Sequence, residues 1–142
     1  MKPASDPFRL HRFLDGQAVP YASVVAELRA GRKRTHWMWF IFPQIAGLGS
    51  SEASIHYAIA SLDEARAYAD HPILGERLRE CAGLVLAVEG RTAPQIFGVV
   101  DEMKFRSSMT LFALATPEES VFAACLAKYF GGERDAATLA RV

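Results

Sequence analysis

The sequence has few cysteines, no excess of either charge and no long apolar run, and each absence excludes a class of protein. Its 142 residues contain two cysteines, Cys81 and Cys125, without a CxxC pair or a Cys/His cluster, so we expect neither a structural zinc site nor a cofactor. Sixteen basic and sixteen acidic residues cancel, and a neutral chain attracts polyanions weakly, so nucleic acid is not an expected partner. No apolar run approaches the roughly 20 residues of a membrane-spanning helix.

What remains is the class of small globular proteins. Apolar residues make up 51% of the chain, which suits a packed core and argues against disorder. A domain of this length buries roughly 70% of its unfolded surface, so it needs no metal or disulfide for stability. The N-terminal stretch MKPASDPF lacks the apolar segment of a secretory signal. We therefore expect a cytoplasmic protein with reduced, buried cysteines.

Apolar residues recur at helical spacing along most of the chain, between residues that typically cap or interrupt helices. The first helix is expected to start at Asp6-Pro7, with the proline in the first helical position, and to end at Gly16. The other expected helices begin beside these residues: Pro20, Ser50 or Ser51, Ser61, Pro72, Thr92, Val100, Thr116 and Asp135.

Two kinds of pattern set these helix boundaries. Ile55, Ile59 and Leu62 have the spacing of one apolar stripe, on the helix that follows the serines. Ser61-x-x-Glu64 and Thr116-Pro-Glu-Glu119 have the capping-box pattern, in which the first hydroxyl and the last acidic side chain each accept a backbone N–H. Capping alone would explain the carboxylate of Glu64.

The aromatic block Trp37–Phe42 fits either a buried strand or a buried helical turn. A strand needs a partner, and the only candidates, 85–88 and 97–100, fit helices better. We therefore predict a short buried helix here. The whole chain is then an all-α, single compact multi-helix domain spanning residues 1–142, with its core at about 6–132.

The basic residues before this block are the first candidate site. Lys33 and Arg34 could clamp an anionic group, and His36 could act as an acid or base near neutral pH. The alternative is a solvated loop after a helix C-terminus, where cations are favoured in any case.

The residues of and after the block extend the candidate site. Trp37 or Trp39 could stack on a planar ligand, or both could simply fill the core. Gln44 could hydrogen-bond the edge of such a ligand, or cap backbone groups.

A series of hydroxyl groups follows the glycine-rich turn. Ser51, Ser54, Tyr57 and Ser61 lie three or four residues apart and would share one helix face, where an anionic group could bind. The alternative is ordinary capping and polar surface. No nucleophile-elbow motif accompanies the serines, so a catalytic triad is not expected.

Polar residues also interrupt the apolar stripe of the helix near Val100. Asp101 and Lys104 are spaced as an ion pair, while Ser107 and Thr110 share a stripe with Met103. Polar groups on an apolar stripe need partners inside the fold, or they line a pocket.

Two functional hypotheses follow. In the first, the domain binds or hydrolyses a small anionic and partly planar ligand such as a nucleotide or an ADP-ribose derivative. His36 or Asp101 would then move protons, and Lys104 would tune the acid by its charge. In the second, the domain is a protein-interaction module with Trp37 and Trp39 as an exposed hot spot. The residues alone leave enzymatic activity and oligomeric state open.

Three long motifs resemble one known family. The runs RKRTHWMWFIFPQIAGLGSS, EARAYADHPILGERLRE and IFGVVDEMKFRSSMTLFA are similar to domain-of-unknown-function family 1810, and the resemblance extends from Asp6 to about Gly132. It implies a small helical bacterial protein without an assigned activity. Members have been labelled calpastatin, but calpastatins are disordered inhibitors and this composition is that of a folded domain. A fainter similarity is to the NADAR group of ADP-ribose-handling domains, and it assigns no catalytic residue to this chain.

Overall fold

The computed structural model describes residues 5–142, and it folds them into ten helices. These are α1 (His11–Gln17), α2 (Tyr21–Arg29), α3 (Met38–Ile41), α4 (Glu52–His56), α5 (Leu62–Asp70), α6 (Leu74–Ala87), α7 (Ala93–Phe97), α8 (Val99–Ala115), α9 (Val121–Phe130) and α10 (Ala136–Leu139). Within 5–142 the only β-type pairing is an isolated parallel bridge between Ile45 and Ile59. The predicted all-α single domain is thus confirmed. Residues 1–4, which open the N-terminal stretch discussed above, lie outside the described residues.

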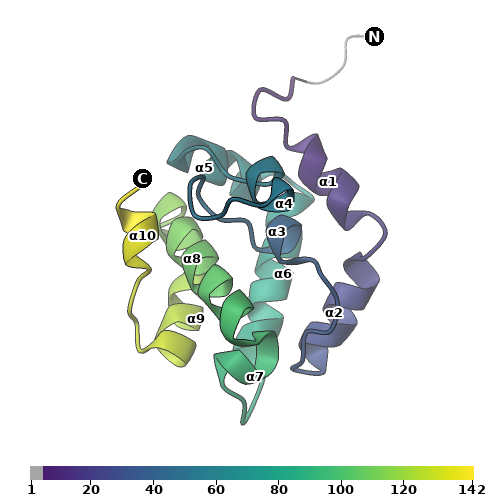
Figure 1. Cartoon of the computed structure of the whole chain (residues 1–142), viewed down its shortest axis with the longest axis vertical. Helices are drawn as coiled ribbons and strands as arrows, with labels where there is room; N and C mark the ends of the chain where they lie inside the picture. Colours follow the sequence, from purple (N-terminus) through teal and green to yellow (C-terminus); the bar gives the residue numbers. More distant parts are fainter. Residues whose placement is uncertain (1–4) are drawn as a thin grey trace.

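Helix α9 packs against both α6 and α8, and these three helices form the centre of the molecule. Figure 1 shows α1 and α2 on one side of this centre and α10 on the other. The short helix α3 contacts α1, α6 and α8, and its Met38 and Ile41 are buried. The prediction of a short buried helix in the Trp37–Phe42 block is therefore confirmed.

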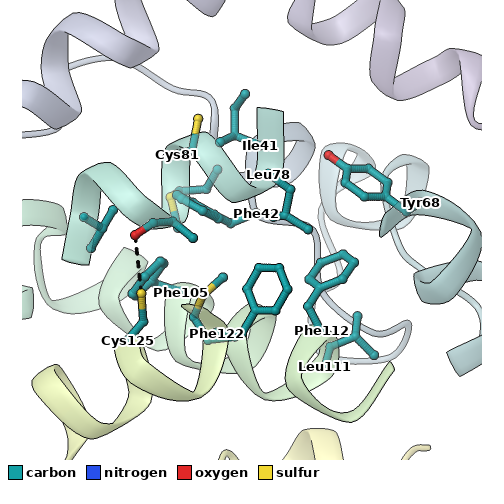
Figure 2. Packing of buried hydrophobic residues seen from close by; sticks show 14 of the residues in the cluster. Ile41, Phe42, Tyr68, Leu78, Cys81, Phe105, Leu111, Phe112, Phe122 and Cys125 are labelled. Atoms are coloured by element: carbon teal, nitrogen blue, oxygen red, sulfur yellow. Dashed lines mark hydrogen bonds between the residues drawn. The ribbon is translucent and has the colours of Figure 1, made fainter. Parts of the chain in front are cut away.

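Aromatic side chains from distant segments meet in the core (Figure 2). The Phe42 ring, just after α3, lies edge-on to Phe105 of α8 with the centroids 4.9 Å apart. Both cysteines are buried and free, and the Cys125 thiol donates to the carbonyl of Ala82 at 3.4 Å. Burial raises the pKa of Cys81 and of Cys125 to about 12, so both thiols stay protonated at neutral pH.

The first helix begins later than its sequence suggests. The Asp6 carboxylate accepts hydrogen bonds from the backbone N–H of Leu10 at 2.7 Å and of His11 at 3.0 Å, so the chain makes a turn before α1 starts. Arg9 lies in that turn with a φ of 53°. The prediction of a helix start at Pro7 was wrong because the carboxylate caps N–H groups farther along the chain than a helical cap would.

The predicted stripe of Ile55, Ile59 and Leu62 is also wrong. Helix α4 ends at His56 and leaves Ile55 66% exposed, while Ile59 is buried beside Ile45 in the bridge. Leu62 starts the next helix, α5. The bridge competes with continued helix here, because it buries Ile59 and satisfies two backbone N–H groups.

The two predicted capping boxes have different outcomes. Ser61 does accept the N–H of Glu64 at 3.1 Å, but the Glu64 carboxylate bonds to the N–H of Ala60 and to the guanidinium of Arg12. The box at Thr116 is wrong: its hydroxyl donates to the carbonyl of Phe112 and closes α8, and α9 starts only at Val121. None of the helices in residues 5–142 is long and apolar enough to cross a lipid bilayer.

Candidate functional site

Two segments far apart in the chain meet at one carboxylate. Lys33, in the loop between α2 and α3, places its Nζ 2.9 Å from Oδ2 of Asp101 in the first turn of α8. Lys104, one turn later, places its Nζ 3.3 Å from Oδ1 of the same residue. A hollow of about 340 Å³ opens beside this cluster, and we refer to it as the lysine hollow. Its lining includes Lys33, His36, Trp37, Trp39, Asp101 and Lys104.

Local backbone features explain why these segments meet. Gly31 ends α2 with a φ of 71°, and the next residues run beside the junction of α7 and α8 (Figure 1). There the N–H of Lys33 donates to the carbonyl of Ile96 at 2.8 Å. Gly98 has a φ of 85°, which lets α8 start directly after α7 and present Asp101 to the loop.

Glu27, which sequence reasoning missed, holds the basic run in place. Its carboxylate accepts hydrogen bonds from the N–H groups of Arg34 and Thr35, from the Thr35 hydroxyl and from the indole of Trp37 at 3.1 Å. Burial alone would raise the pKa of Glu27, but these donors outweigh it and lower the pKa to about 2. A carboxylate near the C-terminus of α2 is unfavourable for the helix dipole. Its position in the sequence therefore indicated that Glu27 has a partner elsewhere in the fold.

The two tryptophans differ in what they can contact. Trp37 has no exposed surface, and the Nζ of Lys33 lies 5.3 Å from its ring centroid. Trp39 is half-buried, with Lys104 Nζ 5.2 Å from its centroid, and its indole N–H has no hydrogen-bond partner among residues 5–142. Trp37 therefore belongs to the core, and Trp39 is the partly exposed tryptophan in the lining of the hollow. An exposed hot spot made by both tryptophans does not exist in this fold.

A second hollow, of about 280 Å³, adjoins the first, since Val100 and Lys104 line both. We refer to it as the Asp135 hollow. Its lining includes Gln44, Leu48, Ser54, Met103, Ser107, Asp135 and Ala137. Tyr57 lines a much smaller cavity of about 10 Å³, which Trp39, Gln44 and Ser54 share. The structure therefore brings Gln44, Ser54, Tyr57 and Ser107 to one side of the lysine hollow.

Other predicted site residues lie elsewhere or are occupied. Arg34 is exposed and lines neither hollow. Ser51 accepts the N–H of Ser54 at 3.1 Å as the cap of α4, and Ser61 caps α5, so the expected common helix face of serines was wrong. Thr110 is buried and donates to the carbonyl of Arg106, and it lines neither hollow.

The expected apolar stripe of α8 is wrong in its first turns. Val99, Val100 and Met103 are 71%, 66% and 65% exposed, while Ser107 farther along is buried. The hydroxyl of Ser107 lies within donating distance of both the Met103 carbonyl and the Asp135 carboxylate. The start of α8 therefore adds apolar surface beside the charged cluster, and its middle adds polar groups to the core.

The charges present define what this site can hold. Two ammonium groups lie beside a single carboxylate, and His36 is exposed at the edge of the same hollow. This arrangement suits an oxyanion. Among the described residues, no group of three or more His, Cys, Asp or Glu side chains is placed to hold a metal ion.

Comparison with known proteins places the chain in a family. No curated protein matches it. The crystal structure of the conserved hypothetical protein Rv1873 from Mycobacterium tuberculosis is similar, with 58% sequence identity, coverage of 95% of this chain and 96% of that chain, and a TM-score of 0.94. The family described as "Protein of unknown function (DUF1810)" matches over residues 7–142. The resemblance of the three motifs is thereby confirmed, and the chain belongs to the DUF1810 family.

Proposed function

We propose that this domain binds a small anionic, partly planar ligand in the lysine hollow. One observation carries the proposal: Lys33 and Lys104 come from distant segments and converge on the Asp101 carboxylate beside a cavity of about 340 Å³. A cavity of this volume suits a small metabolite rather than a protein chain. The proposal includes a cytoplasmic location, where the buried cysteines would remain reduced.

The lysines are held in position before any ligand arrives. Each ammonium group contacts the Asp101 carboxylate, and each also lies over a tryptophan ring. Side chains fixed in this way lose less conformational entropy on binding than free surface lysines do. An incoming phosphate or carboxylate would compete with Asp101 for the two ammonium groups. Because this attraction is electrostatic, the affinity of the ligand should fall as the salt concentration rises.

Trp39 supplies the planar part of the recognition. Its ring lines the hollow next to Lys104, so a flat group attached to the anion would stack on it. In the same proposal, hydrolysis of the ligand would use His36, because that imidazole is exposed at the edge of the hollow. Asp101 is the less suitable proton carrier, since both of its oxygens already accept contacts from lysine.

Titration of the full chain with inorganic phosphate and with nucleoside monophosphates tests the proposal. We expect saturable quenching of tryptophan fluorescence and a rise in Tm for the wild type. Both signals should be lost when Lys33→Met and Lys104→Met are combined, because methionine keeps the length of the side chain without its charge. The control, Arg32→Gln, removes a charge from an exposed residue of the same basic run that does not line the hollow. Equal binding by the double variant and the control would contradict the proposal.

A further inference from the structure

We infer that the ligand is asymmetric, with an anionic end in the lysine hollow and a neutral, hydrogen-bond-donating end in the Asp135 hollow. The inference rests on the proposed function and narrows its ligand class. It starts from the contact between the hollows: Val100 and Lys104 line both, so one molecule can extend from one hollow into the other.

The charges of the two hollows are opposite. The lysine hollow carries two ammonium groups and His36 against a single carboxylate. The Asp135 hollow has Lys104 only at the shared boundary, and its own charged group is Asp135. A ligand with an anionic group at each end would place its second charge against the Asp135 carboxylate, and like charges at close range repel.

The Asp135 hollow also contains unused hydrogen-bonding capacity. Oδ2 of Asp135 accepts from the Ser107 hydroxyl at 3.1 Å and from the N–H and hydroxyl of Thr138 at 2.9 and 2.6 Å. Its Oδ1 accepts no hydrogen bond from residues 5–142. The side-chain amide of Gln44 neither donates nor accepts one within the same residues. An acceptor oxygen and an unbonded amide on two residues of one lining suit hydroxyl, amide or amino groups on the ligand.

Between its polar groups the Asp135 hollow has an apolar wall. Leu48, Val100 and Met103 line it, and the last two are 66% and 65% exposed. Exposed apolar side chains that gather beside a charged site are typical of a binding surface. They would cover the ring or hydrocarbon body that joins the two ends of the ligand. The class that fits is a molecule with one anionic headgroup and a flat, neutral, donor-bearing body.

Matched small probes test this class directly. Para-carbamoylphenyl phosphate and para-carboxyphenyl phosphate have nearly the same shape, but the first ends in a neutral donor and the second in an anion. We expect the wild-type protein to bind the carbamoyl probe about tenfold more tightly than the carboxy probe and than inorganic phosphate. Para-carbamoylbenzoate replaces the phosphate by a carboxylate, and its match with an anionic group at each end is terephthalate. Tighter binding of the carbamoyl member of either pair supports the inference and identifies the headgroup.

Two variants locate the effect in the Asp135 hollow. Asp135→Asn removes the charge but keeps an oxygen that can cap α10, so the fold should be retained and the preference for the carbamoyl probe should fall to about twofold or less. Ala137→Phe fills the hollow from an exposed position of α10. It should reduce the affinity for the carbamoyl probe to that for inorganic phosphate and leave phosphate binding unchanged. Circular dichroism and Tm verify that each variant is folded.

The outcomes separate this inference from the proposed function. If inorganic phosphate binds as tightly as the organic probes, or if both para substituents bind equally, the inference is overturned and the anion site stands. If neither phosphate nor any organic probe binds the wild type, both proposals are overturned.

Discussion

The molecule contains two charged clusters that join distant segments, and they are built for different purposes. One is the ion pair of Arg12 and Glu64, which links α1 to the start of α5. The other is the set of Lys33, Asp101 and Lys104. The side chains of the first cluster are 4% and 5% exposed, whereas those of the second are 7%, 19% and 24% exposed and open to a hollow.

Every donor of the closed cluster has an acceptor in the protein. Arg12 donates through Nε to the carbonyl of His56, and through its two Nη atoms to the carbonyls of Phe8, Arg9 and Ala58 and to Glu64. These bonds use the full capacity of a guanidinium group. The cluster therefore links α1 to the irregular chain after α4, and Arg12 has no unused N–H donor that could bind a ligand.

The open cluster lacks this saturation. Each lysine has three N–H donors, and among residues 5–142 the only polar partner of either ammonium group is the Asp101 carboxylate. Buried charge with complete pairing indicates a structural role, whereas partly exposed charge with spare donors beside a hollow indicates a binding role. The difference lies in the unused donors, not in the number of charges.

Breaking the closed cluster should give the largest change in stability. Arg12→Met leaves the Glu64 carboxylate buried with the N–H of Ala60 as its remaining partner, and it removes the donors to four backbone carbonyls. We expect the free energy of unfolding to fall by about 3–5 kcal/mol, measured by urea denaturation.

The matched control is Arg66→Met. Arg66 also pairs with acidic residues, Asp70 and Glu118, but on the surface, and we expect little change in its unfolding midpoint. Arg12→Met and Arg66→Met unfolding at similar urea concentrations would contradict the structural role of the closed cluster.

Asp101→Asn should have a smaller effect on stability and an opposite effect on binding. It removes the only anion within residues 5–142 that contacts the two lysines, at an expected cost of about 1 kcal/mol for these partly exposed pairs. The cation–π contacts with Trp37 and Trp39 still hold the ammonium groups, so phosphate should bind about tenfold more tightly. Calorimetric titration with phosphate measures the change.

Asp63→Asn is the matched control for this charge removal, because Asp63 is exposed in the first turn of α5. It should leave phosphate affinity unchanged. A loss of phosphate binding in Asp101→Asn would mean that the carboxylate is needed to position the lysines and does not compete with the ligand.

Glu27→Gln tests the support of the open cluster through pH. The pKa of Glu27 is lowered from 4.5 to about 2 in the fold, so its charge stabilises the folded state above pH 4.5, and this stabilisation is lost as the pH falls toward 2. At neutral pH the variant should lose about 1 kcal/mol, since Glu27 is only half-buried. The difference in Tm between variant and wild type should shrink between pH 4.5 and pH 2. A constant difference over that range would show that the charge of Glu27 is not what matters.

Features that depend on neighbours in the chain could be predicted. Pro20 precedes α2, Thr92 caps α7 and Asp135 caps α10, all as their sequences indicate. The start of α1 and the end of α4 could not be predicted, because Asp6 and the bridge at Ile59 satisfy backbone groups that a helix would otherwise bond.

In the candidate site, too, local sequence patterns predicted some features and contacts between distant segments determined the others. Polar residues that interrupt apolar stripes identified both segments of the lysine hollow, including Lys33, Asp101 and Lys104. The pairing of Arg12 with Glu64 has no periodic signal, because it joins residues in separate helices. Asp135 was recognised only as a helix start, since nothing local places its carboxylate beside the middle of α8.

Arg34→Gln should have the smallest effect of all, and it tests whether the open cluster is defined by geometry or by general positive charge. Arg34 is exposed, and its side chain makes no hydrogen bond or ion pair with residues 5–142. What the fold uses is its backbone N–H, which donates to Glu27 at 2.6 Å and which glutamine retains. We expect no measurable change in unfolding by urea or in phosphate affinity, whereas Lys33→Met next to it should weaken phosphate binding about tenfold. Equal weakening by both variants would mean that the whole basic run attracts the anion through its net charge, and the lysine hollow would then have no special role in binding.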